Sequence, residues 1–207
     1  SVINVSDAQN VFINGGTYAA TRRSANAASG YTVNLSSVDN TIKIDNATFL
    51  APGVDQNWVN LGGGTGLQLI SPNIVILNNV TSEGGMGKQR RSGGPDDTSN
   101  DAGTWDGGSI GGGNGLTLSG AGSATVYATN LIAEAGDAGK FFVTSQRVDN
   151  DTVSMESSGG AGIVGSSALN IMTGTITGKD AGEATFNSDD GDNFNVNWTA
   201  NGGNGIS

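Results

Sequence analysis

Short runs of alternating apolar and polar residues recur along the whole chain, and turns rich in Gly and Asn separate them. These runs include residues 2–6, 31–35, 42–44, 74–77 and 169–172. Alternation with a period of two predicts β-strands that each bury one face, whereas no stripe of apolar residues at helical spacing appears. The pattern therefore predicts an all-β fold.

A small-residue motif opens each repeat of this pattern. A glycine followed by an apolar or aromatic residue begins a strand-like run, and a polar turn and further short runs come next. Successive marker glycines lie about 36, 49, 47 and 43 residues apart, which is too variable for the short-repeat solenoids. The order of elements predicts a single β-solenoid domain over residues 1–207. The five motifs are Ser29-Gly30-Tyr31, Thr65-Gly66-Leu67, Asn114-Gly115-Leu116, Ala161-Gly162-Ile163 and Asn204-Gly205-Ile206.

The motifs divide the chain into about five coils of one parallel β-helix, which we expect to be right-handed because parallel crossovers almost always are. The extra length of the longer coils falls at one recurring place, which predicts long loops along one edge. Asn tolerates a left-handed backbone, so Asn14, Asn46 and Asn79 are expected to stack as a ladder at one corner.

The two ends of the chain have the pattern of complementary halves of one coil. Residues 2–6 match residues 32–36, and residues 205–207 open a coil that stops. No amphipathic helix is available to cap either end, so we expect residues 1–29 and 205–207 to share a coil between neighbouring subunits, head to tail. The expected interface comprises Ser1, Val2, Ile3, Val5, Val11, Ile13, Val196, Trp198, Gly205, Ile206 and Ser207.

Composition restricts the chemistry that the chain can perform. It has no His and no Cys, so the commonest general base, thiol nucleophiles and structural zinc sites are missing. The net charge of −10 opposes binding to nucleic acid and to anionic membranes. We expect no catalytic residue, no obligatory cofactor and no membrane insertion. A strongly hydrated acidic surface suits an extracellular or cell-surface location, most simply in a prokaryote.

The longest loop, residues 84–113, carries a basic run followed by acidic residues and a tryptophan. Such a ring can stack on a sugar while carboxylates bind its hydroxyl groups. The alternative is that opposite charges pair across a solvated loop, or that the loop contacts a neighbouring subunit. The residues for a carbohydrate or lateral contact are Arg90, Arg91, Asp96, Asp97, Trp105 and Asp106.

Two acidic loops occupy equivalent places in successive coils, because residues 138–145 align with residues 181–188 and a glycine-rich run follows each. Carboxylates stacked about 4.8 Å apart would suit calcium, although Asp, Asn and Gly are also ordinary turn formers. The candidate calcium ligands are Asp149, Asp151, Asp189, Asp190 and Asp192.

The combination of Gly motif, short strands, Asn-marked corner and one long-loop edge resembles the pectate-lyase-like right-handed β-helix superfamily over essentially the whole chain. That superfamily includes polysaccharide lyases, glycosidases, phage tailspikes and bacterial surface adhesins. Its polygalacturonase pattern includes a Gly-His-Gly, which a chain without histidine cannot supply. Asp189-Asp190 is similar to the paired aspartates of that branch, but nothing around the pair completes the set.

The resemblance and the open ends together predict a structural protein rather than an enzyme. We expect a subunit that polymerises with copies of itself into an extracellular β-solenoid filament. A tandem segment of a large bacterial surface adhesin would have the same local pattern, and a module that binds or degrades polysaccharide would use the long-loop edge.

An ice-binding solenoid is a further alternative, because it needs regular rows of threonine. Thr17, Thr48, Thr81 and Thr175 occur at comparable positions, but we expect Asn130 or Leu131 to interrupt that row.

Overall fold

A computed structural model describes most of the chain as β-strands. It covers residues 2–20, 31–51, 63–70, 73–87, 90–93, 104–119, 124–139, 141–145, 152–165, 168–182, 184–188 and 195–207. These ranges contain no helix, and so none long and apolar enough to cross a membrane.

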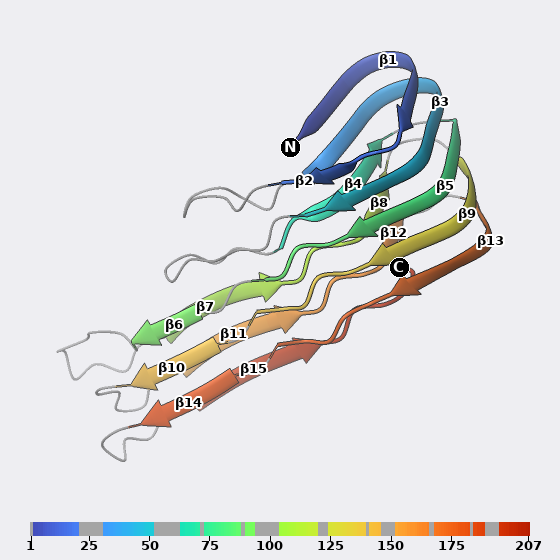
Figure 1. Ribbon diagram of the computed structural model, residues 1–207. Coiled ribbons are helices and arrows are strands. Elements are labelled where there is room, and N and C mark those ends of the chain that lie inside the picture. Colours follow the sequence, from blue (N-terminus) through green and yellow to red (C-terminus); the bar gives the residue numbers. More distant parts are fainter. Residues whose placement is uncertain are drawn as a thin grey trace.

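Nine of the strands form one strongly curved sheet (Figure 1). They are β1 (Ile3–Asn14), β2 (Thr17–Ala19), β3 (Tyr31–Leu50), β4 (Thr65–Ile70), β5 (Ile74–Glu83), β8 (Leu116–Ser119), β9 (Thr125–Glu134), β12 (Ile163–Gly165) and β13 (Ala168–Thr177). Seven of them, in the order β12-β8-β4-β3-β5-β9-β13, are all parallel and curve through 273° around an axis. β1 and β2 add to β3. The prediction of an all-β, parallel fold is confirmed at this level.

Strand pairing stacks the chain in levels, each in parallel register with the next. Level 1 is β1 with β2, level 2 is β3, level 3 is β4 with β5, level 4 is β8 with β9, and level 5 is β12 with β13. We call residues that are paired from level to level a column. One column runs through Ile3, Val33, Leu67, Leu116 and Ile163, and Ile206 extends it by an isolated bridge to Ile163.

The marker glycines gave most of this register correctly. Leu67 pairs with Leu116 and Leu116 with Ile163, as the motifs predicted. The first interval was wrong by two residues, because Tyr31 pairs with Thr65 rather than with Leu67. A shift of two keeps every side chain on the same face of its strand, so the alternation of apolar and polar residues does not detect it.

The core lies inside the curved sheet, where apolar side chains stack on apolar side chains of the next level. Most members of the inner columns at levels 2 to 4 are fully buried, and Phe49 is the largest of them. The ring of Phe49 stacks on Tyr18 of level 1, with ring centroids 5.4 Å apart. Burial of this kind stabilises a fold by about 25 cal/mol for each Å² of apolar surface.

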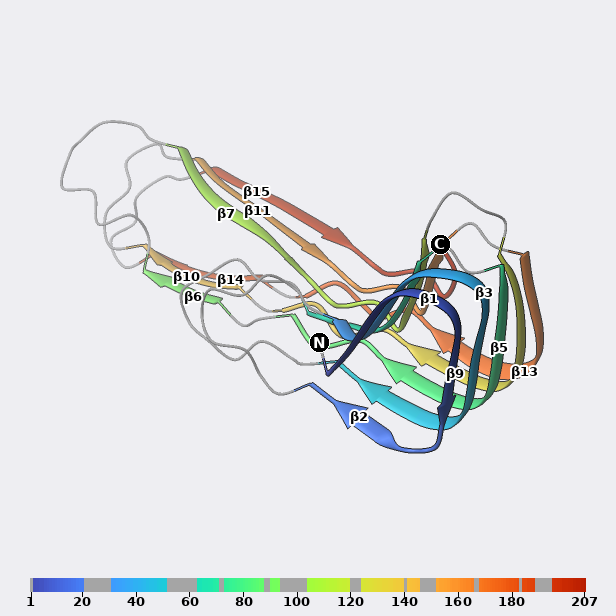
Figure 2. The same cartoon turned by 90° about the horizontal axis from the view of Figure 1, so that it is seen from above.

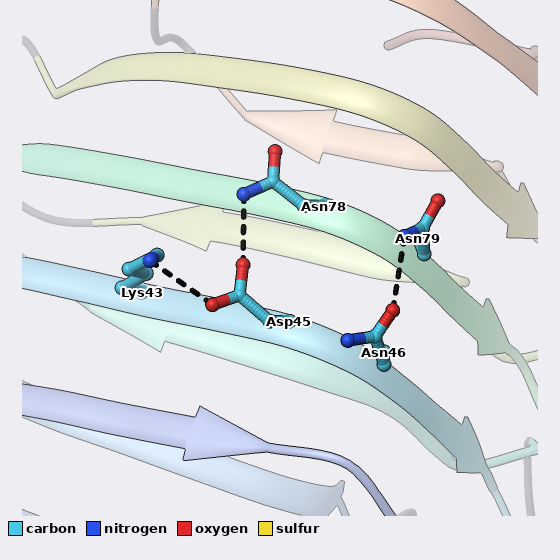
Figure 3. Close-up of polar contacts among 5 residues, drawn as sticks. All are labelled: Lys43, Asp45, Asn46, Asn78 and Asn79. Carbon is cyan, nitrogen blue, oxygen red and sulfur yellow. Dashed lines mark hydrogen bonds and ion pairs between the residues drawn. The ribbon is translucent and has the colours of Figure 1, made fainter.

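A ladder of asparagines turns the chain at one corner of the sheet (Figure 3). Asn46, Asn79 and Asn130 all have a left-handed backbone, with φ of 54°, 52° and 54°. The Asn79 side-chain amide donates to Asn46 Oδ1 at 2.9 Å, and the Asn130 amide donates to Asn79 Oδ1 at 3.1 Å. The predicted ladder is therefore confirmed at Asn46 and Asn79. The expectation for Asn14 was wrong, because Asn14 pairs with Asp45 and Gly15, at φ 78°, takes the left-handed corner position.

The long-loop edge contains two further parallel sheets, so the expectation of loops alone was incomplete. Each sheet has three strands, and Figure 2 shows them as separate layers that extend away from the curved sheet on one side. Phe141 pairs with Ala184 and Ser145 with Ser188, which confirms the alignment of residues 138–145 with 181–188. One sheet comprises β6 (Arg90–Gly93), β10 (Phe141–Ser145) and β14 (Ala184–Ser188), and the other β7 (Thr104–Gly111), β11 (Thr152–Ser158) and β15 (Asn195–Asn201).

A glycine-rich neck joins the curved sheet to these two layers. Segments that leave the curved sheet and segments that return to it alternate along one line of backbone hydrogen bonds. At its central glycines a side chain has no room: a Cβ on Gly113 would lie 1.8 Å from Gly64 O, and one on Gly136 would lie 1.9 Å from Gly85 O. The bonds run from Gly85 N to Gly64 O, Gly113 N to Gly85 O, Gly136 N to Gly113 O, Gly160 N to Gly136 O, Lys179 N to Gly160 O and Gly203 N to Lys179 O.

The neck should therefore tolerate no side chain at its centre. Gly113→Ala is expected to lower the free energy of unfolding by at least about 3 kcal/mol, the upper range for overpacking, because its Cβ would collide with a backbone oxygen. Gly202→Ala is the matched control: its Cβ would meet nothing within 4 Å, so the expected change is within about 0.5 kcal/mol. Denaturant unfolding of both variants measures the difference, and equal stabilities would contradict this account of the neck.

Two substitutions of Asn79, at the Asn corner, distinguish the effect of backbone strain on stability from the effect of the side-chain hydrogen bonds. Asn79→Ala should cost about 2–3 kcal/mol, because Ala resists the left-handed conformation and the ladder bonds are lost. Asn79→Gly loses the same side-chain bonds but adopts that conformation freely, so its cost should be nearer to about 1 kcal/mol. Thermal unfolding compares the two variants. An Asn79→Gly variant as unstable as Asn79→Ala would show that strain plays no part.

Candidate assembly interface

The N-terminal edge of the curved sheet is β1, which pairs with β3 and with no other described strand. Its inward side chains are only partly covered. Ile3, Val5 and Val11 are half-buried, whereas their level-2 partners are fully buried. Within the described chain, level 1 thus forms backbone hydrogen bonds and side-chain contacts with a neighbouring level on one side only. The level-2 partners of Ile3, Val5 and Val11 are Val33, Leu35 and Ile42, in that order.

The C-terminal edge mirrors this arrangement. Within the described chain β13 pairs only with β9, and Leu169, Ile171 and Ile176 pack against the core while remaining partly exposed. Their level-4 partners Val126, Ala128 and Ala133 are buried. Both ends of the stack therefore present the same kind of surface, a parallel strand edge above half-covered apolar side chains.

Neither edge strand carries the charges that usually keep a sheet edge from pairing. β13 contains no charged residue, and β1 contains Asp7 alone. Asp7 lies at a corner with φ 59°, beside the equivalent Ser37 at φ 53°, so it turns the chain rather than interrupting a strand. The two edges are chemically suited to accept another strand.

Two ion pairs lie close to the edges, and each is formed within the subunit; Figure 3 shows the one between Lys43 and Asp45. The Asn78 amide donates to Asp45 Oδ1 at 2.7 Å and Lys43 Nζ lies 3.1 Å from Asp45 Oδ2; these contacts lower the pKa of the Asp45 carboxyl. Close to the C-terminal end, Lys179 Nζ lies 2.6 Å from Glu134 Oε1, and this bond raises the pKa of Lys179. Because Lys179 turns toward level 4, its charge is matched inside the subunit.

The residues expected at the interface fall on or beside these edges. Val2 and Ile206 are about half exposed, at 49% and 52%, while Ile13 is buried at 9%. Val196 and Trp198 lie in β15, the edge strand of its own three-stranded sheet on the same side as β13. Gly205 and Ser207 extend past β12, and Ser1 lies outside the described residues.

The residues predicted for the interface did not include Leu169, Ile171 and Ile176, whose partly exposed side chains form the apolar surface of the C-terminal edge. The alternation in residues 168–176 was visible, but it predicted only a buried strand. The signal that would have identified these residues is the alignment of that run with Asn10–Asn14 of level 1, since both are outermost copies of one pattern.

The proposed carbohydrate residues are divided between two sheets. Arg90 and Arg91 are in β6, whereas Trp105 and Asp106 are in β7. Pairing places Arg90 beside Phe141 and Trp105 beside Val153, in different layers. Asp96 and Asp97 lie outside the described residues, so a sugar site on this edge stays a prediction.

The calcium candidates also lie outside the described residues: Asp149, Asp151, Asp189, Asp190 and Asp192. The strands that flank the two acidic loops are in register, because β10 pairs with β14 and β11 with β15. The loops thus begin and end one level apart. Among the residues that are described, no group of three or more potential ligands could hold a metal ion.

The threonine row predicted for an ice-binding face is present but interrupted. Thr17, Thr48 and Thr81 form one column, Ile132 follows, and Thr175 completes it. The interrupting residue is Ile132, one position beyond the expected Asn130 or Leu131. The register of β5 with β9 is unbroken there, so Val80 pairs with Leu131 and Thr81 with Ile132. One interrupted row does not form the regular two-dimensional array that this function requires.

Comparison with known proteins does not identify a family for this chain. Neither the protein-family models, nor the curated proteins, nor the solved structures include a match to this chain. The comparisons thus identify no family, and what the structure shows is an all-β fold with a near-closed, curved parallel sheet.

Proposed function

We propose that the chain is a right-handed parallel β-helix of about five coils whose copies stack end to end into an extracellular filament. The five levels of the curved sheet are then its coils. The observation that carries this proposal is the match between the two edges. β1 and β13 are the outermost copies of the same columns, and Asp7, which lies at a corner, is the one charged residue in these two strands.

Stacking level 1 of one copy on level 5 of another continues the apolar columns. Val11 of the incoming copy would lie against Leu169, Ile13 against Ile171, and Tyr18 against Ile176. All of these side chains except Ile13 are half-covered in one subunit and would become buried, and each edge would gain backbone partners. A backbone hydrogen bond contributes about 1 kcal/mol net, so a junction with many of them should dissociate slowly.

This contact joins two different surfaces, so it repeats without closing and produces a fibre. The net charge of −10 per chain opposes the approach of two copies, and salt screens that repulsion within about 8–10 Å. A durable acidic fibre without catalytic residues suits a structural or adhesive role at a prokaryotic surface. If the next copy were joined covalently, the same contact would occur inside a long adhesin, and a full-length mass would distinguish the two cases.

Cysteine cross-linking tests the proposed register directly, because the natural chain has no Cys. The exposed Phe12 heads the column that ends at Asn170. In a stack, Phe12 of one copy would lie beside Asn170 of the next, about 4.8 Å away. Oxidised Phe12→Cys/Asn170→Cys protein should therefore show a ladder of multimers on a non-reducing gel.

A matched control variant keeps the cysteine at position 12 and moves the second cysteine to another column. Phe12→Cys/Ile132→Cys pairs Phe12 with a residue that is 39% exposed but lies in another column, so it should give no ladder. Absence of a ladder from the first variant, or an equal ladder from both, would contradict end-to-end stacking in this register.

A further inference from the structure

We infer that Ile206 and Ser207 are a displaceable cover over the C-terminal edge, and that β1 of a second copy takes their place on assembly. The inference rests on the proposed filament and describes how its junction forms. It differs from the expectation that residues 1–29 and 205–207 fill complementary halves of one coil.

The two segments occupy the same columns. Ile3 pairs with Val33, and the column of Val33 continues through Leu67, Leu116 and Ile163 to Ile206. One residue further along the strand, Asn4 of the second copy would likewise take the position of Ser207. A second copy that is stacked without a gap would bring its Ile3 to the position that Ile206 already occupies.

If the C-terminal segment stayed in place when β1 of a second copy docked, one level would be missing from the stack next to β13. If Ile3 of the second copy stacked on Ile206, its residues 10–14 would stand one level too far from β13, because β13 is the last level on that side. The apolar residues Leu169 and Ile171 would then face a gap one strand wide, about 4.8 Å. Close packing of the columns requires one segment to leave.

The C-terminal segment is the weaker of the two. Its docking consists of an isolated bridge and a few backbone bonds: Ile163 N donates to Gly205 O at 2.8 Å, Gly165 N to Ser207 O at 3.0 Å, and Ser207 N to Ile163 O at 2.9 Å. The side chain of Ile206 is still 52% exposed. In contrast, β1 is a continuous strand of 12 residues that can also pair along β13.

Displacement needs only a local movement. Gly203 is held in the neck by its bond to Lys179 O, and Gly205 follows two residues later. A rotation between these glycines would free Ile206 and Ser207 while leaving the neck intact. In the separate subunit, the same segment lies over Ile163, which is fully buried, and so shields this edge until a second copy arrives.

A disulfide lock tests whether the segment must leave. Ile163 and Ile206 are bridged, so Val164 and Ser207 follow side by side, at a spacing that a disulfide spans. Oxidised Val164→Cys/Ser207→Cys should assemble at least about tenfold more slowly than the wild type by light scattering, since a covalent lock cannot be displaced. Reduction should restore the wild-type rate.

The control is an equivalent lock away from the edges. Thr48 and Thr81 are paired inside the stack, so oxidised Thr48→Cys/Thr81→Cys should assemble at the wild-type rate. If oxidised Val164→Cys/Ser207→Cys assembles as fast as its reduced form, displacement is wrong although the filament stands. A wild type that never assembles overturns both proposals.

A second pair of variants does not depend on disulfide formation. Ser207→Pro removes the N–H that donates to Ile163 O, and Ser207→Ala keeps it. Displacement predicts a lag about fivefold shorter for Ser207→Pro, the effect of one lost backbone bond on docking of the segment. A longer lag would indicate that residues 205–207 are a required part of the junction, and would overturn the inference.

Discussion

Parallel backbone pairing between successive levels is the interaction on which the rest of this structure depends. It fixes which side chains meet, so that Leu67 lies on Leu116 and Asn46 on Asn79. Once that register is set, the core and the corner ladder follow as columns of similar residues, and the two outer sheets repeat the same parallel pairing with more varied residues. The same pairing leaves level 1 and level 5 with unused edges in the described part of the chain, and this connects the fold with the proposed assembly.

The glycine neck explains how one chain supports both a curved sheet and two flat layers. Leaving and returning segments cross within the distance of a backbone hydrogen bond, and at the central glycines a Cβ would collide with a neighbouring carbonyl oxygen. Gly113 and Gly136 occupy the centre of that crossing. Part of the high glycine content of the chain, 35 residues of 207, therefore has a structural cause in this region.

Local pattern and repeat spacing were enough to predict the all-β parallel fold, the match of Ile3 with Val33 and the alignment of Phe141 with Ala184. They could not fix the first interval, because a shift of two residues leaves the alternation unchanged. Asn14 was misplaced because Asn14 and Gly15 both accept a left-handed backbone, and only the partner strand decides between them. Leu169 and Ile171 were missed because exposure at an end depends on what is stacked there, which a strand's own sequence does not specify.

Cryo-electron microscopy of the protein at neutral pH and moderate salt tests the central claim most directly. Stacking of five levels, at about 4.8 Å each, predicts filaments with an axial rise of about 24 Å per subunit. It also predicts that density for β1 of one copy continues the columns of β13 in the next. Monodisperse single subunits at high concentration, or a rise about one strand spacing longer, would contradict the gapless end-to-end junction.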